Sequence, residues 1–244
     1  MAALNSTTPS PTCGGGAFAT THWSLILSAA REDQPDSLQA LETLCQIYWR
    51  PLHAFVRRSG YSPADADDLT QAFFAHLIGS GLVKKVQVEG GKFRSFLVVS
   101  LKNFLASERE RAHAQKRGGG RPALPIEACG IEIEDSSDSP DLAFDKAWAV
   151  TVLQEAMDLL AREHHAAGRE AVFEQLRIFL TGEKSALPYS VVAERLGTSE
   201  GAVKMMVQRM RRRYRECLHA VVLRTVARAD QVDDELRHLR EALG

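Results

Sequence analysis

The chain has 244 residues and a formal net charge of -1, with 45% hydrophobic and 25% charged residues. These values are typical of a globular protein with one large core or two small ones. They argue against a uniformly basic nucleic-acid-binding protein, and the lack of a long apolar run argues against a membrane span. The N-terminus does not resemble a signal peptide, and the four scattered cysteines do not suggest a zinc site. We therefore expect a reduced, cytoplasmic protein without membrane insertion.

The charges are segregated along the chain. Six basic residues and no acidic residue occur between Gly201 and Arg215, whereas seven acidic residues and no basic residue occur between Glu127 and Asp145. A net charge near zero therefore hides a basic segment that could contact phosphates.

The first elements are a polar tail and two helices. Residues 1–19 are small, polar and rich in Gly and Pro, so we predict a disordered tail. Thr20 or Thr21 could then cap a helix over residues 22–32. A longer helix is predicted over residues 36–58, where apolar side chains recur at helical spacing. Pro51 lies inside that pattern and predicts a kink or a break.

Two further helices complete the N-terminal half. Ser62, Pro63 and Asp65 form a strong start signal, with a cap, a proline in the first turn and an early acid. The helix that follows should end at the glycines Gly79 and Gly81. A fourth helix is predicted over residues 92–117, with one apolar stripe that contains Phe93, Leu97, Leu101, Phe104 and Leu105.

The remaining pattern predicts a linker and a second helical region. Residues 118–143 contain glycines, prolines and most of the acidic run, and we interpret them as a flexible linker. Helices are predicted after it over residues 144–163, 169–182, 189–197, 198–229 and 232–243. The expected fold is all-α. Its parts are a tail (1–19), a helical domain (20–117), the linker, a helix-turn-helix domain (144–218) and a helical C-terminal extension (219–244).

Ser199 lies in the sequence G-T-S-E-G, which fits the G-x-S-x-G pattern of a hydrolase nucleophile elbow. An elbow requires a buried strand before the serine and an acid and a histidine after it. The preceding residues instead follow helical spacing, and the later histidines, His219 and His238, lie in predicted helices. We therefore expect no catalytic role for Ser199 and keep a serine hydrolase as a remote alternative.

A helix-turn-helix explains more of the same residues. Gly197 can supply the turn after a short helix, and Ser199 or Thr198 can cap the next one. On the second helix, an inward stripe is predicted at Val203, Val207, Met210 and Tyr214, and an adjacent exposed stripe at Lys204, Gln208, Arg211 and Arg215. This pattern predicts a basic recognition helix on DNA, and the alternative is a merely solvated basic face.

The acidic start of the third helix has three interpretations. Asp65, Asp67, Asp68 and Gln71 could bind a metal, form a solvated helix start, or dock on a partner protein. A metal site is not expected, because only His76 falls at a matching spacing and the glycine spacing of a calcium loop is absent.

Three segments, in this order, resemble the sigma factors of bacterial RNA polymerase. DADDLTQAFFAHLI resembles their region 2.2, FRSFLVVSLKNFLASERERAHAQKR resembles regions 2.3 and 2.4, and YSVVAERLGTSEGAVKMMVQRMRRRYRE resembles region 4.2. A helical domain, a linker and a helix-turn-helix domain match the extracytoplasmic-function class. The resemblance covers roughly residues 20–218.

The resemblance implies a role for each segment. Region 2.2 would dock on the β′ clamp helices of core RNA polymerase through Asp68, Leu69, Gln71 and Phe74. Regions 2.3 and 2.4 would melt the −10 promoter element and hold a flipped base, with Lys102, Asn103, Arg109 and Arg111. The recognition helix would contact the −35 element through Ser199, Glu200, Lys204, Met205, Gln208, Arg209, Arg212 and Arg213. Further implied partners are the polymerase β flap and an anti-sigma factor or other regulator; no catalytic residue, metal or cofactor is implied.

Some positions depart from the family pattern. Ala72 replaces an acid that usually follows the region 2.2 glutamine, and Ser107 replaces a frequent aspartate. Met205 and Met206 replace a common serine-arginine pair, so one expected phosphate contact is missing. We expect an alternative sigma factor of the extracytoplasmic-function class that performs no covalent chemistry. The alternative is a helix-turn-helix transcription regulator that does not act as a sigma subunit.

Overall fold

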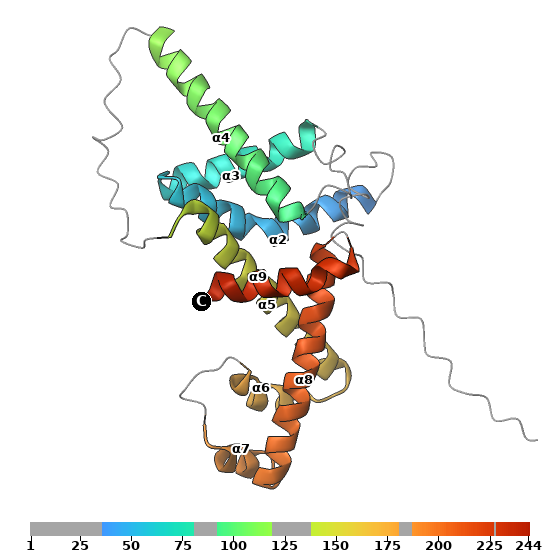
Figure 1. Cartoon of the computed structure of the whole chain (residues 1–244). Helices are drawn as coiled ribbons and strands as arrows, with labels where there is room; N and C mark the ends of the chain where they lie inside the picture. The colour runs from blue at the N-terminus through green and yellow to red at the C-terminus, as the bar shows by residue number, and fades with distance from the viewer. Residues whose placement is uncertain (1–35, 81–91, 119–137, 181–186, 227) are drawn as a thin grey trace, which may run out of the picture.

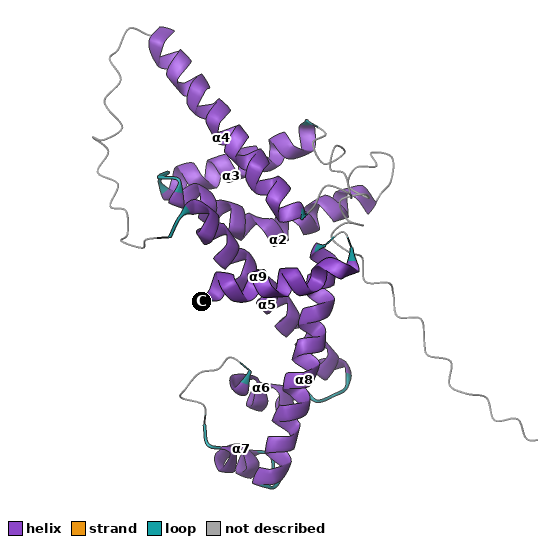
Figure 2. Cartoon of the chain, in the orientation of Figure 1, coloured by secondary structure: helices purple, strands orange, loops and turns teal. Residues whose placement is uncertain are grey.

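The computed structural model describes residues 36–80, 92–118, 138–180, 187–226 and 228–244. These residues form eight α-helices and two short 3-10 helices, and they contain no strand (Figure 2). The predicted all-α class is therefore confirmed for the part of the chain that the structure describes. The predicted tail, the helix expected after Thr20 or Thr21 and most of the predicted linker lie outside the described residues.

The N-terminal half is made of α2 (Asp36–Arg58), α3 (Pro63–Gly79) and α4 (Phe93–Gly118). Helix α2 continues through Pro51, so the break considered there does not occur. The Ser62 hydroxyl accepts a hydrogen bond from the Asp65 backbone N–H at 3.1 Å, and this bond caps α3 as predicted. Phe93 and Phe104 are buried and belong to the core.

The C-terminal half begins with α5 (Pro140–Ala166), α6 (Glu170–Leu176) and the 3-10 helix η4 (Arg177–Phe179). Helices α7 (Tyr189–Arg195) and α8 (Glu200–Thr225) follow, and the 3-10 helix η5 (Ala229–Gln231) leads into α9 (Val232–Leu243). The predicted boundary between residues 218 and 219 thus falls inside α8, and the predicted C-terminal extension comprises the end of α8, η5 and α9.

Helix α5 begins at Pro140, so the last residues of the predicted linker, which ends at residue 143, are helical. The Ser139 hydroxyl accepts a hydrogen bond from the Leu142 backbone N–H at 3.2 Å, and Pro140 opens the first turn. This is the same Ser-Pro signal that marks the start of α3, but here it lies within an acidic, glycine- and proline-rich sequence.

Helix α5 connects the two halves. It packs most extensively against α2, and it also contacts α8 and α9 (Figure 1). Trp148 of α5 and Tyr48 of α2 are almost completely buried, and the buried apolar side chains of all the described α-helices join one hydrophobic cluster. The predicted separation into two helical domains is therefore not confirmed, since α5 shares a core with the N-terminal helices.

Candidate nucleic-acid interface

The turn between α7 and α8 has the backbone pattern that its glycine predicts. The Thr198 N–H donates to the Ala193 carbonyl at 2.9 Å, and the Gly197 N–H donates to the Glu194 carbonyl at 3.2 Å. These two bonds form the Schellman motif that ends a helix. Gly197 has a φ of +61°, in the left-handed region where a glycine is favoured. The chain therefore leaves α7 in a tight, defined turn and enters α8 within a few residues.

Ser199 caps α8. Its hydroxyl accepts a hydrogen bond from the Ala202 backbone N–H at 3.2 Å, and its backbone is extended. Because helix α7 and not a strand precedes Ser199, the geometry of a nucleophile elbow is not present at this position. Ser199 therefore has a local structural role as the N-cap of α8.

The two predicted stripes of α8 are confirmed. Val203, Val207 and Met210 are buried, and Tyr214 is half-buried with its hydroxyl donating to the Leu153 carbonyl at 3.1 Å. The residues of the predicted polar stripe are exposed: Lys204, Gln208, Arg211 and Arg215. Helices α7 and α8 contact each other directly, so the described residues contain a helix-turn-helix with one buried and one basic face.

The residues that the resemblance places on the −35 element are all exposed. Lys204 forms an ion pair with Glu200 at 2.7 Å, and this bond raises the pKa of the Lys204 ammonium. Arg212 lies 3.2 Å from Glu216. Met205 is 51% exposed, which is unusual for a large apolar side chain and leaves it available for contact with a partner.

Arg213 differs from Lys204 and Arg212, whose ion pairs lie within α8. Its guanidinium donates to both carboxylate oxygens of Glu163 on α5, at 2.7 and 2.6 Å, and to Glu216 at 2.7 Å. The hydrogen bonds from Arg213 hold the pKa of the Glu163 carboxyl below its ordinary value. A phosphate would have to replace these carboxylates before it could bind Arg213. The geometry therefore gives Arg213 an intramolecular role in this arrangement.

The predicted −10 residues lie on the exposed side of α4, and three of them are paired. Lys102 forms an ion pair with Asp141 of α5 at 2.7 Å. Arg109 donates to the Tyr61 hydroxyl at 2.9 Å and lies over the Tyr61 ring, with 5.3 Å between its Cζ and the ring centroid. Arg111 forms an ion pair with Glu108.

A cavity of about 230 Å³ lies beside Asn103. Its lining combines one side of α4 with one residue of α3: His76, Ser100, Asn103, Phe104, Ser107 and Arg111. The rings of His76 and Phe104 are 5.5 Å apart, so the cavity has aromatic groups as well as amide, hydroxyl and guanidinium groups. Asn103 and Arg111 are predicted DNA contacts, whereas Ser100 was not considered and Ser107 was noted only as a departure from the family pattern. The spacing of both serines from Asn103 along the helix is the signal that could have identified them.

The predicted polymerase-docking face is smaller than expected. Asp68 and Gln71 are exposed and Leu69 is half-buried, but Phe74 is only 6% exposed. The Phe74 ring stacks on Trp49 of α2, with 5.9 Å between centroids and 8° between planes. Phe74 is therefore mostly buried in this structure, and its predicted contact with a polymerase stays a prediction. Position 74 lies on the same helical face as buried Phe73 and Leu77, because α3 packs broadly on α2.

Among the described residues, no group of three or more His, Cys, Asp and Glu side chains could hold a metal ion. Asp67, one of the acids weighed as a metal ligand, lies 3.2 Å from His53 Nε2. No helix in the described part of the chain is long and apolar enough to cross a membrane.

The chain matches no protein-family model, and searches of curated proteins and of solved structures returned no match.

Proposed function

We propose that this chain is an alternative sigma factor similar to the extracytoplasmic-function class, which binds core RNA polymerase and directs it to promoters. The observation that carries the proposal is the helix-turn-helix of α7 and α8. Its turn, its serine cap and its exposed basic face lie in the segment that resembles region 4.2. A capped helix N-terminus with basic side chains along one face suits the major groove and its phosphates.

The recognition helix offers two kinds of contact to a −35 element. Gln208 and Arg209 are exposed, and neither has a hydrogen-bond or ion-pair partner among the described residues, so both are free to reach base edges. Lys204 and Arg212 have exposed acidic partners that phosphates can replace at low cost, because exposed ion pairs are weak. Met205 could pack against a thymine methyl group.

The −10 function would rest on α4. The cavity beside Asn103 combines stacking groups with hydrogen-bonding groups, as a site for an unstacked base requires. Exposed basic residues continue along the same helix, at Arg109 and at Arg111, which also lines the cavity. Polymerase docking would use the remaining exposed part of α3, at Asp68, Leu69 and Gln71.

One observation favours a second candidate, a helix-turn-helix regulator that is not a sigma subunit. The helix-turn-helix is complete, whereas Phe74 of the predicted polymerase-docking face is buried in the core. A regulator would bind specific DNA without binding core polymerase, and this difference separates the two candidates.

The proposed function is tested by transcription in vitro. Core RNA polymerase is mixed with the purified chain and with genomic fragments of the encoding organism, and transcript 5′ ends are mapped. We expect start sites that share a −10 and a −35 element and that are lost with Gln208→Ala/Arg209→Ala. Arg228→Ala is the matched control, because Arg228 is an exposed arginine paired with Asp230 outside the interface. Transcripts that do not depend on the added chain would contradict the proposal.

A further inference from the structure

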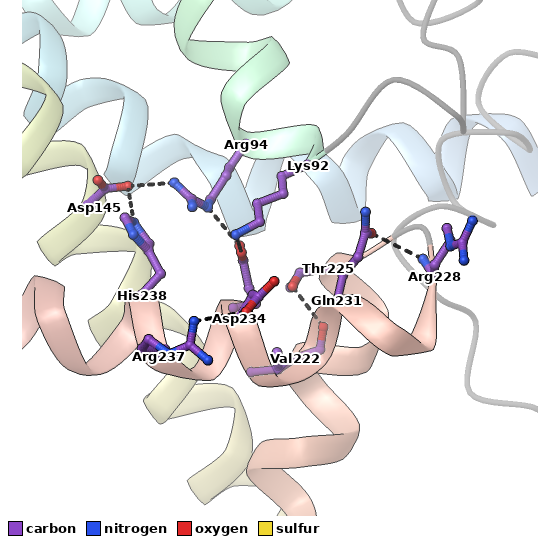
Figure 3. Close-up of polar contacts among 11 residues, drawn as sticks. Lys92, Arg94, Asp145, Val222, Thr225, Arg228, Gln231, Asp234, Arg237 and His238 are labelled. Atoms are coloured by element: carbon purple, nitrogen blue, oxygen red, sulfur yellow. Dashed lines mark hydrogen bonds and ion pairs between the residues drawn. The ribbon is translucent and has the colours of Figure 1, made fainter.

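The C-terminal helix α9 is joined to the start of α4 by a buried carboxylate. Glu235 of α9 is only 1% exposed, and its two oxygens lie 2.6 Å from Lys92 Nζ and 2.7 Å from Arg94 Nε. Figure 3 shows Lys92 and Arg94 extending from the start of α4 towards α9. A buried carboxylate is stable only while both cations stay in place, since an unpaired buried charge is strongly unfavourable.

A second carboxylate extends the same cluster to α5. Asp145 Oδ1 lies 3.0 Å from Arg94 Nη1 and 3.0 Å from Nε2 of His238 on α9 (Figure 3). The Arg94 guanidinium also lies over the Trp148 ring, 5.3 Å from its centroid. Arg94 therefore joins α4, α5 and α9 at one point and is only 12% exposed.

Apolar contacts hold α9 in place without involving the recognition face of α8. Val232, Leu239 and Ala242 are buried, and α9 contacts α5 and α8. In Figure 1, α9 lies beside α5 and the C-terminal end of α8, away from α7 and the turn. The helix-turn-helix could therefore keep its geometry if α9 moved.

The carboxylates of α5 pair with one cation of each predicted DNA face. Lys102 on α4 pairs with Asp141. Lys92 and Arg94, at the start of α4, are not predicted DNA contacts; they pair with Glu235 and Asp145 and hold α4 against α5 and α9. At the other end of α5, Glu163 binds Arg213 of the recognition helix. The Lys102 and Arg213 pairs are exposed and contribute little stability. The arrangement in which α4, α5, α8 and α9 pack together, here called closed, therefore depends on buried contacts, which include those of Glu235.

We propose that α9 is an intramolecular latch, which keeps these basic residues paired with the chain's own carboxylates and is released when nucleic acid binds. This inference rests on the proposed function, because it assumes that α4 and α8 both contact DNA. If the open form makes up roughly 0.1–10% of the free protein, the latch weakens DNA binding by about tenfold to a thousandfold.

The test compares two variants that change the net charge equally. Glu235→Gln removes the buried carboxylate, and Asp234→Asn removes an exposed one that pairs with Arg237 on the outer side of α9. Binding of the full chain to a fluorescent mixed-sequence DNA duplex is measured at fixed salt. We expect Glu235→Gln to bind at least about tenfold more tightly than wild type, and Asp234→Asn to bind like wild type.

Equal affinities for Glu235→Gln and Asp234→Asn would overturn the latch. If wild type binds DNA but not core polymerase, the proposed sigma function fails alone; if no form binds DNA, both proposals fail. Because Glu235→Gln could disturb folding, hydrogen exchange of the wild-type chain provides a second measurement. The latch predicts faster exchange in α9 when DNA is saturating, and unchanged or slower exchange would overturn it.

Discussion

Arg213 on α8 binds Glu163 on α5 through two parallel hydrogen bonds, with Nε–Oε2 and Nη2–Oε1 distances of 2.7 and 2.6 Å. The two residues are 50 positions apart in sequence, and the pair joins α8 to α5, the helix that connects the two halves. The two-point geometry is the favoured one for arginine and a carboxylate. This pair makes the position of α8 sensitive to the protonation of Glu163.

The pH dependence of this pair follows from the lowered pKa of Glu163. A lowered folded-state pKa contributes stability that is fully present above the ordinary value of 4.5 and is lost as the pH falls through the folded-state value. At pH 7 we expect the unfolding free energy of Glu163→Gln to be about 1 kcal/mol lower than that of wild type. The difference is small because the pair is partly exposed. The difference should shrink as the pH falls below 4.5. Urea unfolding from pH 3 to 7 measures this difference in unfolding free energy. A difference that grows towards low pH would contradict a contribution from the ionised Glu163 carboxylate.

Ser199 is expected to act as a helix cap. Ser199→Ala removes the acceptor for the Ala202 N–H and should cost about 1 kcal/mol of unfolding free energy, whereas Ser199→Asp should retain the cap. Thr198→Ala is the matched control at the neighbouring exposed position. Urea unfolding gives the comparison, and identical midpoints for Ser199→Ala and wild type would count against the cap. A fluorophosphonate probe should leave Ser199 unmodified.

Two glycines near the start of α8 should respond in opposite directions. Gly197→Ala places a Cβ at a φ of +61°, where no other atom lies within 4 Å, so backbone strain alone should cost about 1 kcal/mol. Gly201→Ala lies in the first turn of α8, where its Cβ would meet only the Ser199 hydroxyl at 4.0 Å, and it should stabilise by about 0.5 kcal/mol. Thermal unfolding of both variants checks this, and a shift of the same sign would contradict the turn geometry.

Phe74 should behave as a core residue. Phe74→Ala leaves a cavity beside Trp49 and should cost about 3–5 kcal/mol of unfolding free energy. Gln71→Ala, on the exposed side of the same helix, should change stability by less than about 0.5 kcal/mol. Urea unfolding distinguishes the two variants. A nearly neutral Phe74→Ala would contradict the core role of Phe74.

Local signals in the sequence predicted most of the helices. The bounds of α2 and α9 agree with the predicted ranges, and the cap at Ser62 and the turn at Gly197 occur as expected. These features depend on neighbouring residues, so a sequence shows them directly. The start of α5 was missed because Ser139 and Pro140 follow an acidic sequence typical of linkers.

Tertiary features could not be predicted in the same way. In the helical pattern, Phe74 lies near exposed Gln71 and also near buried Phe73, so the sequence does not say whether its side chain is exposed or buried. The packing of α3 on α2 decides that it is buried. The pairing of Glu235 with Lys92 and Arg94 joins residues more than 140 positions apart. Nothing in the local pattern of α9 distinguishes buried Glu235 from exposed Asp234 except its place on the apolar face.

Binding to core RNA polymerase is the most direct test of the proposed sigma function. The purified chain is run with bacterial core polymerase on a sizing column beside Asp68→Ala/Gln71→Ala, which changes only exposed residues of the docking face. We predict that wild type co-elutes with core polymerase and that the variant, equally stable in urea, does not. If wild type elutes alone, and Glu235→Gln elutes alone as well, the chain does not act as a sigma subunit.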